Sequence, residues 1–167
     1  MGSFGSVFAM AIVGVVIMTS FGVIAKVLTS YEVFISEAKQ ELRSNIYVTS
    51  GRFEDPSTCF VNVTLYGNKS FSINKMRLTD IFVVYKSGGN TISTRLEYGL
   101  SWSISRVLIG SYERELINPI NLTKETGLWD PGETLELQLS LPSPSETSEW
   151  YFLMVLPDGG SGSWTFS

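Results

Sequence analysis

The sequence of 167 residues contains no histidine and a single cysteine, Cys59. It therefore cannot form a Ser-His-Asp or Cys-His nucleophile, a His-based zinc site or an internal disulfide. Twelve Lys and Arg residues against 16 Asp and Glu residues give a net charge of -4, which leaves no cationic excess for a nucleic-acid backbone. We expect no enzyme, no cofactor and no nucleic-acid partner, and we expect Cys59 to be buried as a small apolar side chain.

The carboxylates are the remaining candidates for chemistry. Asp80, Glu97, Asp130 and Glu133 are spread over strand-like and turn-like segments, where no second group positions them for acid–base work. Asp130, Glu133 and Glu136 lie near one turn, but their spacing lacks the dense ligands of a calcium loop. The sequence predicts no catalytic and no metal site.

Charge is also missing from the first 25 residues, because the first charged side chain is Lys26. As a helix this stretch reaches roughly 37 Å at about 1.5 Å per residue, which exceeds a hydrocarbon layer of ~30 Å. We predict a transmembrane helix over residues 1–28. A cleaved signal peptide would carry a basic start and a shorter apolar core, and the myristoylation pattern in MGSFGS is short and common by chance.

An amphipathic segment follows without an intervening Gly or Pro. It predicts a helical stalk over residues 29–45, so that one continuous helix runs from near residue 4 to about residue 44. Its apolar stripe has two interpretations, packing against its own domain or pairing with a second helix. The stripe consists of Val27, Tyr31, Phe34, Ala38 and Leu42.

From Asn45 onward the apolar pattern alternates with a period of two. Gly88-Gly89-Asn90 suits a hairpin loop between two such runs, and Leu135, Leu137, Leu139 and Leu141 share one face of a later run. Seven to nine short strands with turn residues between them predict an all-β fold over residues 46–167. We expect an immunoglobulin-like antiparallel β-sandwich without the disulfide of antibody domains.

Two strand-like runs are apolar on both faces and are candidates for partner binding, because exposed edge strands pair readily with other chains. The alternative is a strand covered on both sides within its own domain. The candidate side chains are Ile81, Val83, Tyr85, Trp102 and Ile104.

Three N-x-[ST] sequons are candidates for glycosylation, at Asn62, Asn68 and Asn121. They favour an extracytoplasmic domain. Lys26, Lys39 and Arg43 after the apolar segment lean towards the opposite orientation under the positive-inside rule, so charge alone does not fix the topology.

Two segments carry a resemblance to a known family. INKMRLTDIFVVYKSGG, with Met76–Tyr85 at its centre, and the GLWDPGE turn at Gly127–Glu133 resemble the archaellum accessory proteins FlaF and FlaG, FlaF more closely. The likeness covers essentially the whole chain. Archaellins and archaeal pilins share the apolar helix and sandwich, but they begin with a basic leader, whereas no basic residue precedes Lys26 here.

The resemblance implies a single-pass protein of the archaeal cell membrane, with its sandwich in the extracytoplasmic space below the S-layer. There it would bind S-layer protein as a stator, with a FlaG-like paralogue and a second copy of itself as further partners. The alternative function is an archaellin-like or pilin-like filament subunit, whose first 28 residues form a filament core. A third is a generic membrane-anchored adhesin or receptor domain.

Overall fold

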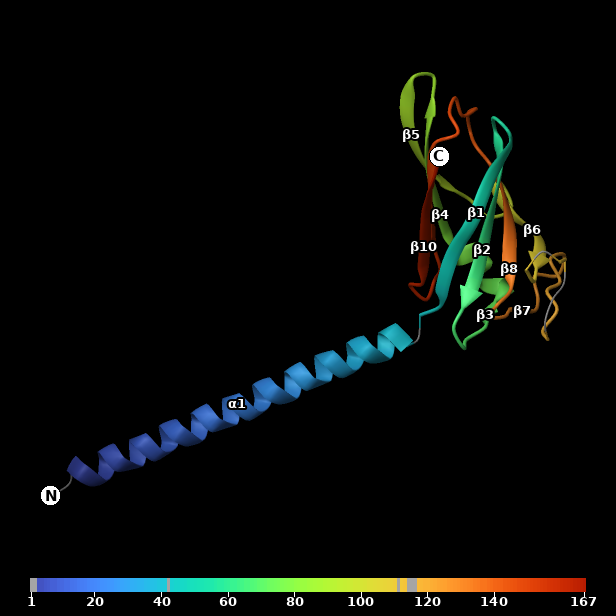
Figure 1. The fold of residues 1–167 in the computed structure, drawn as a ribbon. Helices are drawn as coiled ribbons and strands as arrows, with labels where there is room; N and C mark the ends of the chain where they lie inside the picture. The colour runs from blue at the N-terminus through green and yellow to red at the C-terminus, as the bar shows by residue number, and fades with distance from the viewer. Residues whose placement is uncertain (1–2, 42, 111, 114–116) are drawn as a thin grey trace. The chain divides into compact units, whose positions relative to one another are not determined.

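A computed structural model of the chain describes residues 3–41, 43–110, 112–113 and 117–167 (Figure 1). The chain divides into two units, Met1–Leu42 and Arg43–Ser167. The first unit contains one helix and the second contains the strands, so each is described by itself.

Helix α1, Ser3–Glu41, is continuous, as the uninterrupted sequence predicts, and it ends close to the expected residue 44. Val27 and Tyr31 of the predicted stripe are exposed, while the side chains of Phe34, Ala38 and Leu42 lie outside the described residues. Among the residues that the structure describes, no helix combines the length and the apolar character that a membrane span requires.

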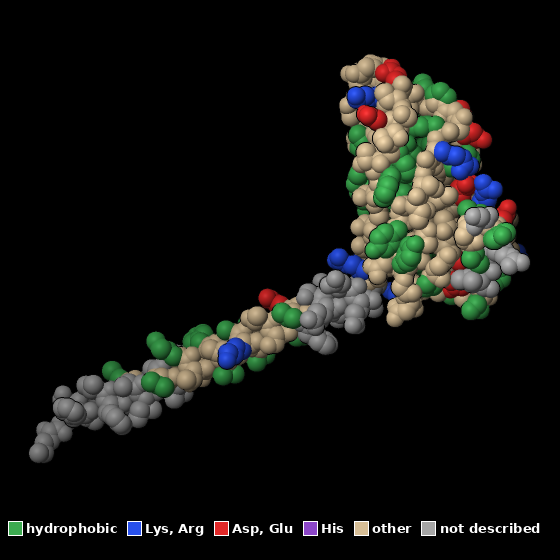
Figure 2. Space-filling model, viewed as in Figure 1, with side chains coloured by type: hydrophobic (Ala, Val, Ile, Leu, Met, Phe, Trp, Pro, Cys, Tyr) green, Lys and Arg blue, Asp and Glu red, His purple; other side chains and the backbone are tan. Residues whose placement is uncertain are grey.

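The described apolar side chains of α1 between Met10 and Val33 are exposed (Figure 2). Successive helical residues are about 100° apart, so Val15, Met18, Val23 and Ile24 point in different directions around the helix, and the exposed apolar set is not confined to one stripe. The exposed large apolar residues are Met10, Val13, Val15, Met18, Phe21, Val23, Ile24, Val27, Leu28, Tyr31 and Val33.

The second unit is a sandwich of antiparallel strands. Sheet 1 has the order β1-β2-β8-β6, sheet 2 has the order β10-β9-β4-β5, and β3 and β7 form a small third sheet. A 3₁₀ helix, Ile73–Leu78, connects β3 to β4. The strands are β1 (Asn45–Asp55), β2 (Thr58–Tyr66), β3 (Phe71–Ser72), β4 (Asp80–Ser87), β5 (Asn90–Leu96), β6 (Trp102–Leu108), β7 (Leu128–Trp129), β8 (Thr134–Ser140), β9 (Trp150–Val155) and β10 (Ser161–Phe166).

The strand order of the two large sheets is that of immunoglobulin-like sandwiches: β1-β2-β8-β6 corresponds to their A-B-E-D sheet and β10-β9-β4-β5 to their G-F-C-C′ sheet. The predicted all-β sandwich is therefore confirmed for the residues from 45 onward. At one side of the sandwich β10 lies beside β1 (Figure 1). Gly162 permits this approach, because a Cβ at that position would stand 3.0 Å from the Ile46 carbonyl oxygen.

The core lies between the two large sheets. Leu135, Leu137 and Leu139 are completely buried and Leu141 is nearly so, as the period-two pattern predicts. Cys59 is also buried, and this burial raises the pKa of its thiol to about 12. The single thiol is therefore an inert core group at neutral pH.

Candidate interaction surfaces

The structure places the first predicted contact strand in the middle of sheet 2. Strand β4 pairs with β9 on one side and with β5 on the other, so it has no free edge. Ile81, Val83 and Tyr85 face the core and are 0–2% exposed. The expectation of an exposed strand edge at residues 81–85 is wrong. Strand β5 follows β4 through a tight hairpin and covers one edge, and β9, which comes from a distant part of the sequence, covers the other.

The second predicted contact strand, β6, is an edge of sheet 1. Its apolar side chains nonetheless face inward, since Trp102 and Ile104 are buried while Ser103 and Ser105 are exposed. Trp102 packs edge-to-face on Tyr98 with ring centroids 4.7 Å apart. A partner at this edge would therefore meet serines and main chain.

An apolar patch that the sequence analysis did not single out lies on the outer face of sheet 2. Register pairs Val84 with Tyr151 and Phe82 with Leu153 across β4 and β9, opposite to the core-facing residues. Tyr151 is 36% exposed and the other three are partly exposed. In the sequence, the run IFVVY already has apolar residues on both faces of its strand. Which of those two faces stays accessible depends on where the second sheet packs. We call these four residues the β4/β9 patch.

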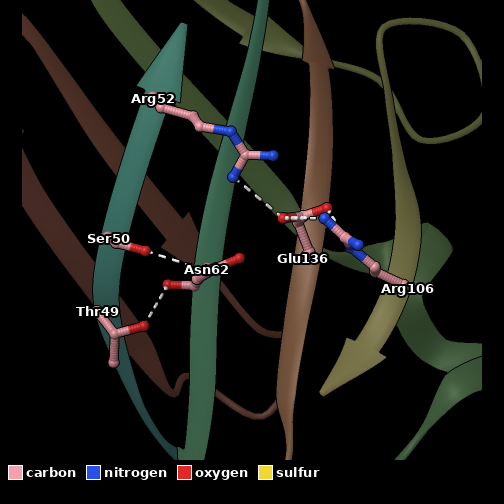
Figure 3. Close-up of polar contacts among 6 residues, drawn as sticks. All are labelled: Thr49, Ser50, Arg52, Asn62, Arg106 and Glu136. Carbon is pink, nitrogen blue, oxygen red and sulfur yellow. Dashed lines mark hydrogen bonds and ion pairs between the residues drawn. The ribbon is translucent and has the colours of Figure 1, made fainter. Parts of the chain in front are cut away.

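The outer face of sheet 1 is polar and is organised around one carboxylate (Figure 3). Glu136 on β8 is only 2% exposed and accepts hydrogen bonds from Arg106 Nε at 2.7 Å and from Arg52 Nη1 at 3.2 Å. Burial acts to raise the pKa of Glu136, but the two guanidinium groups outweigh it, so the pKa lies below its usual value. The three side chains tie β1, β8 and β6 together.

The first sequon lies beside this ion-pair cluster, in the interior of sheet 1. The Asn62 Nδ2 group donates to the Ser50 hydroxyl at 3.0 Å, while its Oδ1 atom is buried without a hydrogen-bond partner in the described part of the chain. A glycan on Nδ2 would have to break the bond to Ser50. Asn68 and Asn121, in contrast, are exposed in loops.

The GLWDPGE segment builds a turn that is held by its own carboxylates. The Glu133 side chain accepts from the Asp130 N–H at 2.8 Å, and the Trp129 indole donates to the Glu133 carbonyl at 2.9 Å. Asp130 in turn accepts from Ser70 and, at 3.0 Å, from Asn118. The motif therefore stabilises the turn that leads into β8.

The other predicted carboxylates stand apart from this turn. Asp80 pairs with Arg95 at 2.6 Å, and Glu97 is exposed after β5. No group of three or more His, Cys, Asp or Glu side chains that would hold a metal ion occurs among the described residues. Glu136 also lies on the outer face of sheet 1, away from the buried turn that holds Glu133.

Comparison with known protein families and with characterised proteins finds no match. Among solved structures, a chain of the archaellum periplasmic stator protein complex FlaF and FlaG from Sulfolobus acidocaldarius matches at a TM-score of 0.50 and 13% identity, over 73% of this chain and 88% of that one. The archaellum periplasmic stator protein FlaG from the same organism also matches at a TM-score of 0.50 and 13% identity, over 74% of this chain and 99% of that one. The chain thus shares the fold of the archaellum stator proteins FlaF and FlaG.

Proposed function

We propose that this chain is an archaellum accessory protein of the stator type. The observation that carries the proposal is the shared fold with two archaellum stator structures, reached independently of the sequence segments that resemble the same family. A stator holds a motor component against a fixed support, so it needs an anchor and a binding surface rather than a reactive group. The proposed role is accordingly non-catalytic.

The proposed anchor is the N-terminal segment, residues 1–28, crossing the archaeal cell membrane once. Its support is the absence of any charged side chain before Lys26 and the exposure of apolar side chains on every side of α1. The segment that follows the anchor, residues 29–45, would act as a stalk between the membrane and the sandwich.

The sandwich is proposed to lie in the extracytoplasmic space below the S-layer. Asn68 and Asn121 support this side of the membrane, because both sequons are accessible in loops. Glycosylation of these two asparagines and of Asn62 is part of the proposal, and we expect Asn62 to be the least modified because its amide is bonded to Ser50.

Three partners are proposed for the sandwich: S-layer protein, another archaellum component such as a FlaG-like paralogue, and a second copy of this chain. A single span in a fluid bilayer is dragged by any torque applied to it, so the holding force has to come from the external lattice. Two joined copies would bind that lattice more tightly through their raised effective concentration. The β4/β9 patch is the proposed lattice contact, since it is apolar, accessible and flanked by polar residues.

An archaellin-like or pilin-like filament subunit is the second candidate. It is favoured by the exposed apolar surface on all sides of α1, which would also suit a helix packed among copies of itself in a filament core. Size analysis of the native assembly separates the two functions. Long polymers held together by α1 would support the filament subunit, and small complexes in the membrane fraction would support the stator.

The test of the stator proposal is retention of the detergent-solubilised full chain on isolated S-layer sheets. We expect saturable retention, and we expect Leu153→Lys to abolish it by placing a charge within the β4/β9 patch. Ser103→Lys is the matched control, because Ser103 is exposed on β6 of sheet 1, away from the patch on sheet 2. No retention of the wild-type chain would refute S-layer binding, and equal retention of both variants would exclude the patch.

A further inference from the structure

Strand β5 is an unprotected edge of sheet 2. It is seven residues long, contains no proline and pairs with β4 without a register shift. The other edges are protected: β1 and β6 each carry irregularities in their pairing, and β10 lies beside β1. Within the described residues, β5 is the regular edge that is open to another strand.

The hairpin before β5 determines which main-chain groups point outward. Gly88 and Gly89 both have positive φ, 58° and 73°, and form a two-residue turn between Ser87 and Asn90. Ser87 and Asn90 are therefore the closing hydrogen-bonded pair, and bonding to β4 alternates from there along β5.

The alternation leaves one set of main-chain groups on β5 without a neighbouring strand. Asn90, Ile92, Thr94 and Leu96 bond to β4, whereas Thr91, Ser93 and Arg95 direct their N–H and C=O groups to the free edge. The side chains of the same three residues are exposed on the outer face of sheet 2.

We propose that β5 pairs with β5 of a second copy of this chain, antiparallel, about a two-fold axis at Ser93. In this register Ser93 lies opposite Ser93 of the second copy, and Thr91 lies opposite Arg95 of the second copy. Every outward N–H and C=O of the three residues then finds a partner, because antiparallel ladders pair such residues with one another. Two four-stranded sheets become one continuous sheet.

Charge and symmetry favour a second copy as the occupant. Arg95 is the only charged residue on β5, and the two-fold places it opposite threonine rather than opposite another arginine. Asp80 already pairs with Arg95 at 2.6 Å within each copy, so the contact buries no unpaired charge. The strand is thus complementary to itself, as an isologous interface requires.

The inference rests on the homodimer within the proposed function and is independent of the archaellum role. It predicts that the two Ser93 Cα atoms lie about 5.5 Å apart, within the roughly 4.4–6.8 Å that a disulfide accepts. The native Cys59 is buried with a raised pKa, so a cysteine introduced at the edge is the reactive thiol.

The first experiment is oxidation of the full chain carrying Ser93→Cys in its membrane fraction, read as covalent dimer on a denaturing gel. The matched control is Thr91→Cys, which is also exposed but stands about 14 Å along the strand from its symmetry mate at ~3.4 Å per residue. We expect covalent dimer from Ser93→Cys alone. Equal cross-linking of both variants would indicate random collision and overturn the register.

The second experiment measures the dimer of the solubilised full chain by sedimentation. Ser93→Pro removes an outward N–H without touching the bonds to β4, so it should weaken the dimer by roughly tenfold or more, while Ser93→Val, which keeps the N–H, should not. Ser93→Glu places two carboxylates opposite each other and should weaken the dimer, whereas Thr91→Glu faces Arg95 and should retain it.

The possible outcomes distinguish the β5 contact from the existence of the homodimer. A dimeric wild type that keeps its dimer with Ser93→Pro would overturn the β5 contact and leave the homodimer intact. A strictly monomeric wild type would overturn both the homodimer and its contact, while S-layer retention would still test the stator role.

Discussion

Two glutamates of this sandwich have different structural roles, because their surroundings differ. Glu133 is buried within a turn and holds its own main chain, whereas Glu136, three residues later, is held on the outer sheet face by two arginines. Leu137 follows on the opposite face and is completely buried. Substitutions at these positions are therefore expected to change the stability of the fold in different ways.

Leu137→Ala should lower the free energy of unfolding by about 2–5 kcal/mol, because it removes buried methyl groups and leaves a cavity between the sheets. The neighbouring Gln138→Ala points to the outer face, where it is partly exposed, and should change stability little. Chemical denaturation of both variants measures the difference. Equal stability of the two would show that β8 is misoriented.

Glu136 should make stability depend on pH in the acid range. Its pKa is lowered from 4.5 in the folded state, so its contribution is fully present above pH 4.5 and is lost as the pH falls through the folded value. Glu136→Gln should be less stable than the wild type at pH 7, and the gap should narrow on acidification. Parallel stability curves from pH 7 to pH 3 would contradict this assignment.

At the scale of elements, the contact between β1 and β10 depends on glycine. A Cβ at Gly160 would collide with the Ser44 carbonyl oxygen, and one at Gly162 would crowd the Ile46 carbonyl oxygen at 3.0 Å. The two strands belong to different sheets, so this close approach closes one side of the sandwich.

Gly160→Ala should therefore destabilise the sandwich by about 1–3 kcal/mol through overpacking. Ser161→Ala is a suitable control because Ser161 is exposed at the start of β10. Thermal unfolding compares the two. A Gly160→Ala variant as stable as the control would mean that β10 moves away from β1 without cost.

At the scale of the whole molecule, the helix and the sandwich are expected to be separable. The strand unit has its own core between two sheets, so it does not require the apolar helix to bury its leucines. Deleting Met1–Val27 should give a soluble, folded β protein, which circular dichroism and sedimentation of the supernatant would measure. An unfolded fragment, or one that remains with the membrane, would contradict the division into anchor and sandwich.

Much of this architecture follows from the sequence because it depends on local periodicity. The leucines at 135, 137 and 139 alternate, which is enough to place them on one face and hence in the core. The uninterrupted run from residue 3 to residue 41 contains no proline, which is enough for one continuous helix. The absence of histidine excludes a Ser-His-Asp triad and a His-based zinc site.

The location of the contact surface was decided only by the tertiary structure. IFVVY in β4 has the stronger apolar pattern, yet it is covered by β9 and β5, while the polar TISTR segment in β5 lies at the edge. Which strand is an edge depends on the order of pairing between segments that are distant in sequence, and local alternation carries no information about that order. The sequence determined which residues form strands and face inward, and the packing of strands from across the chain decided which of them meet a partner.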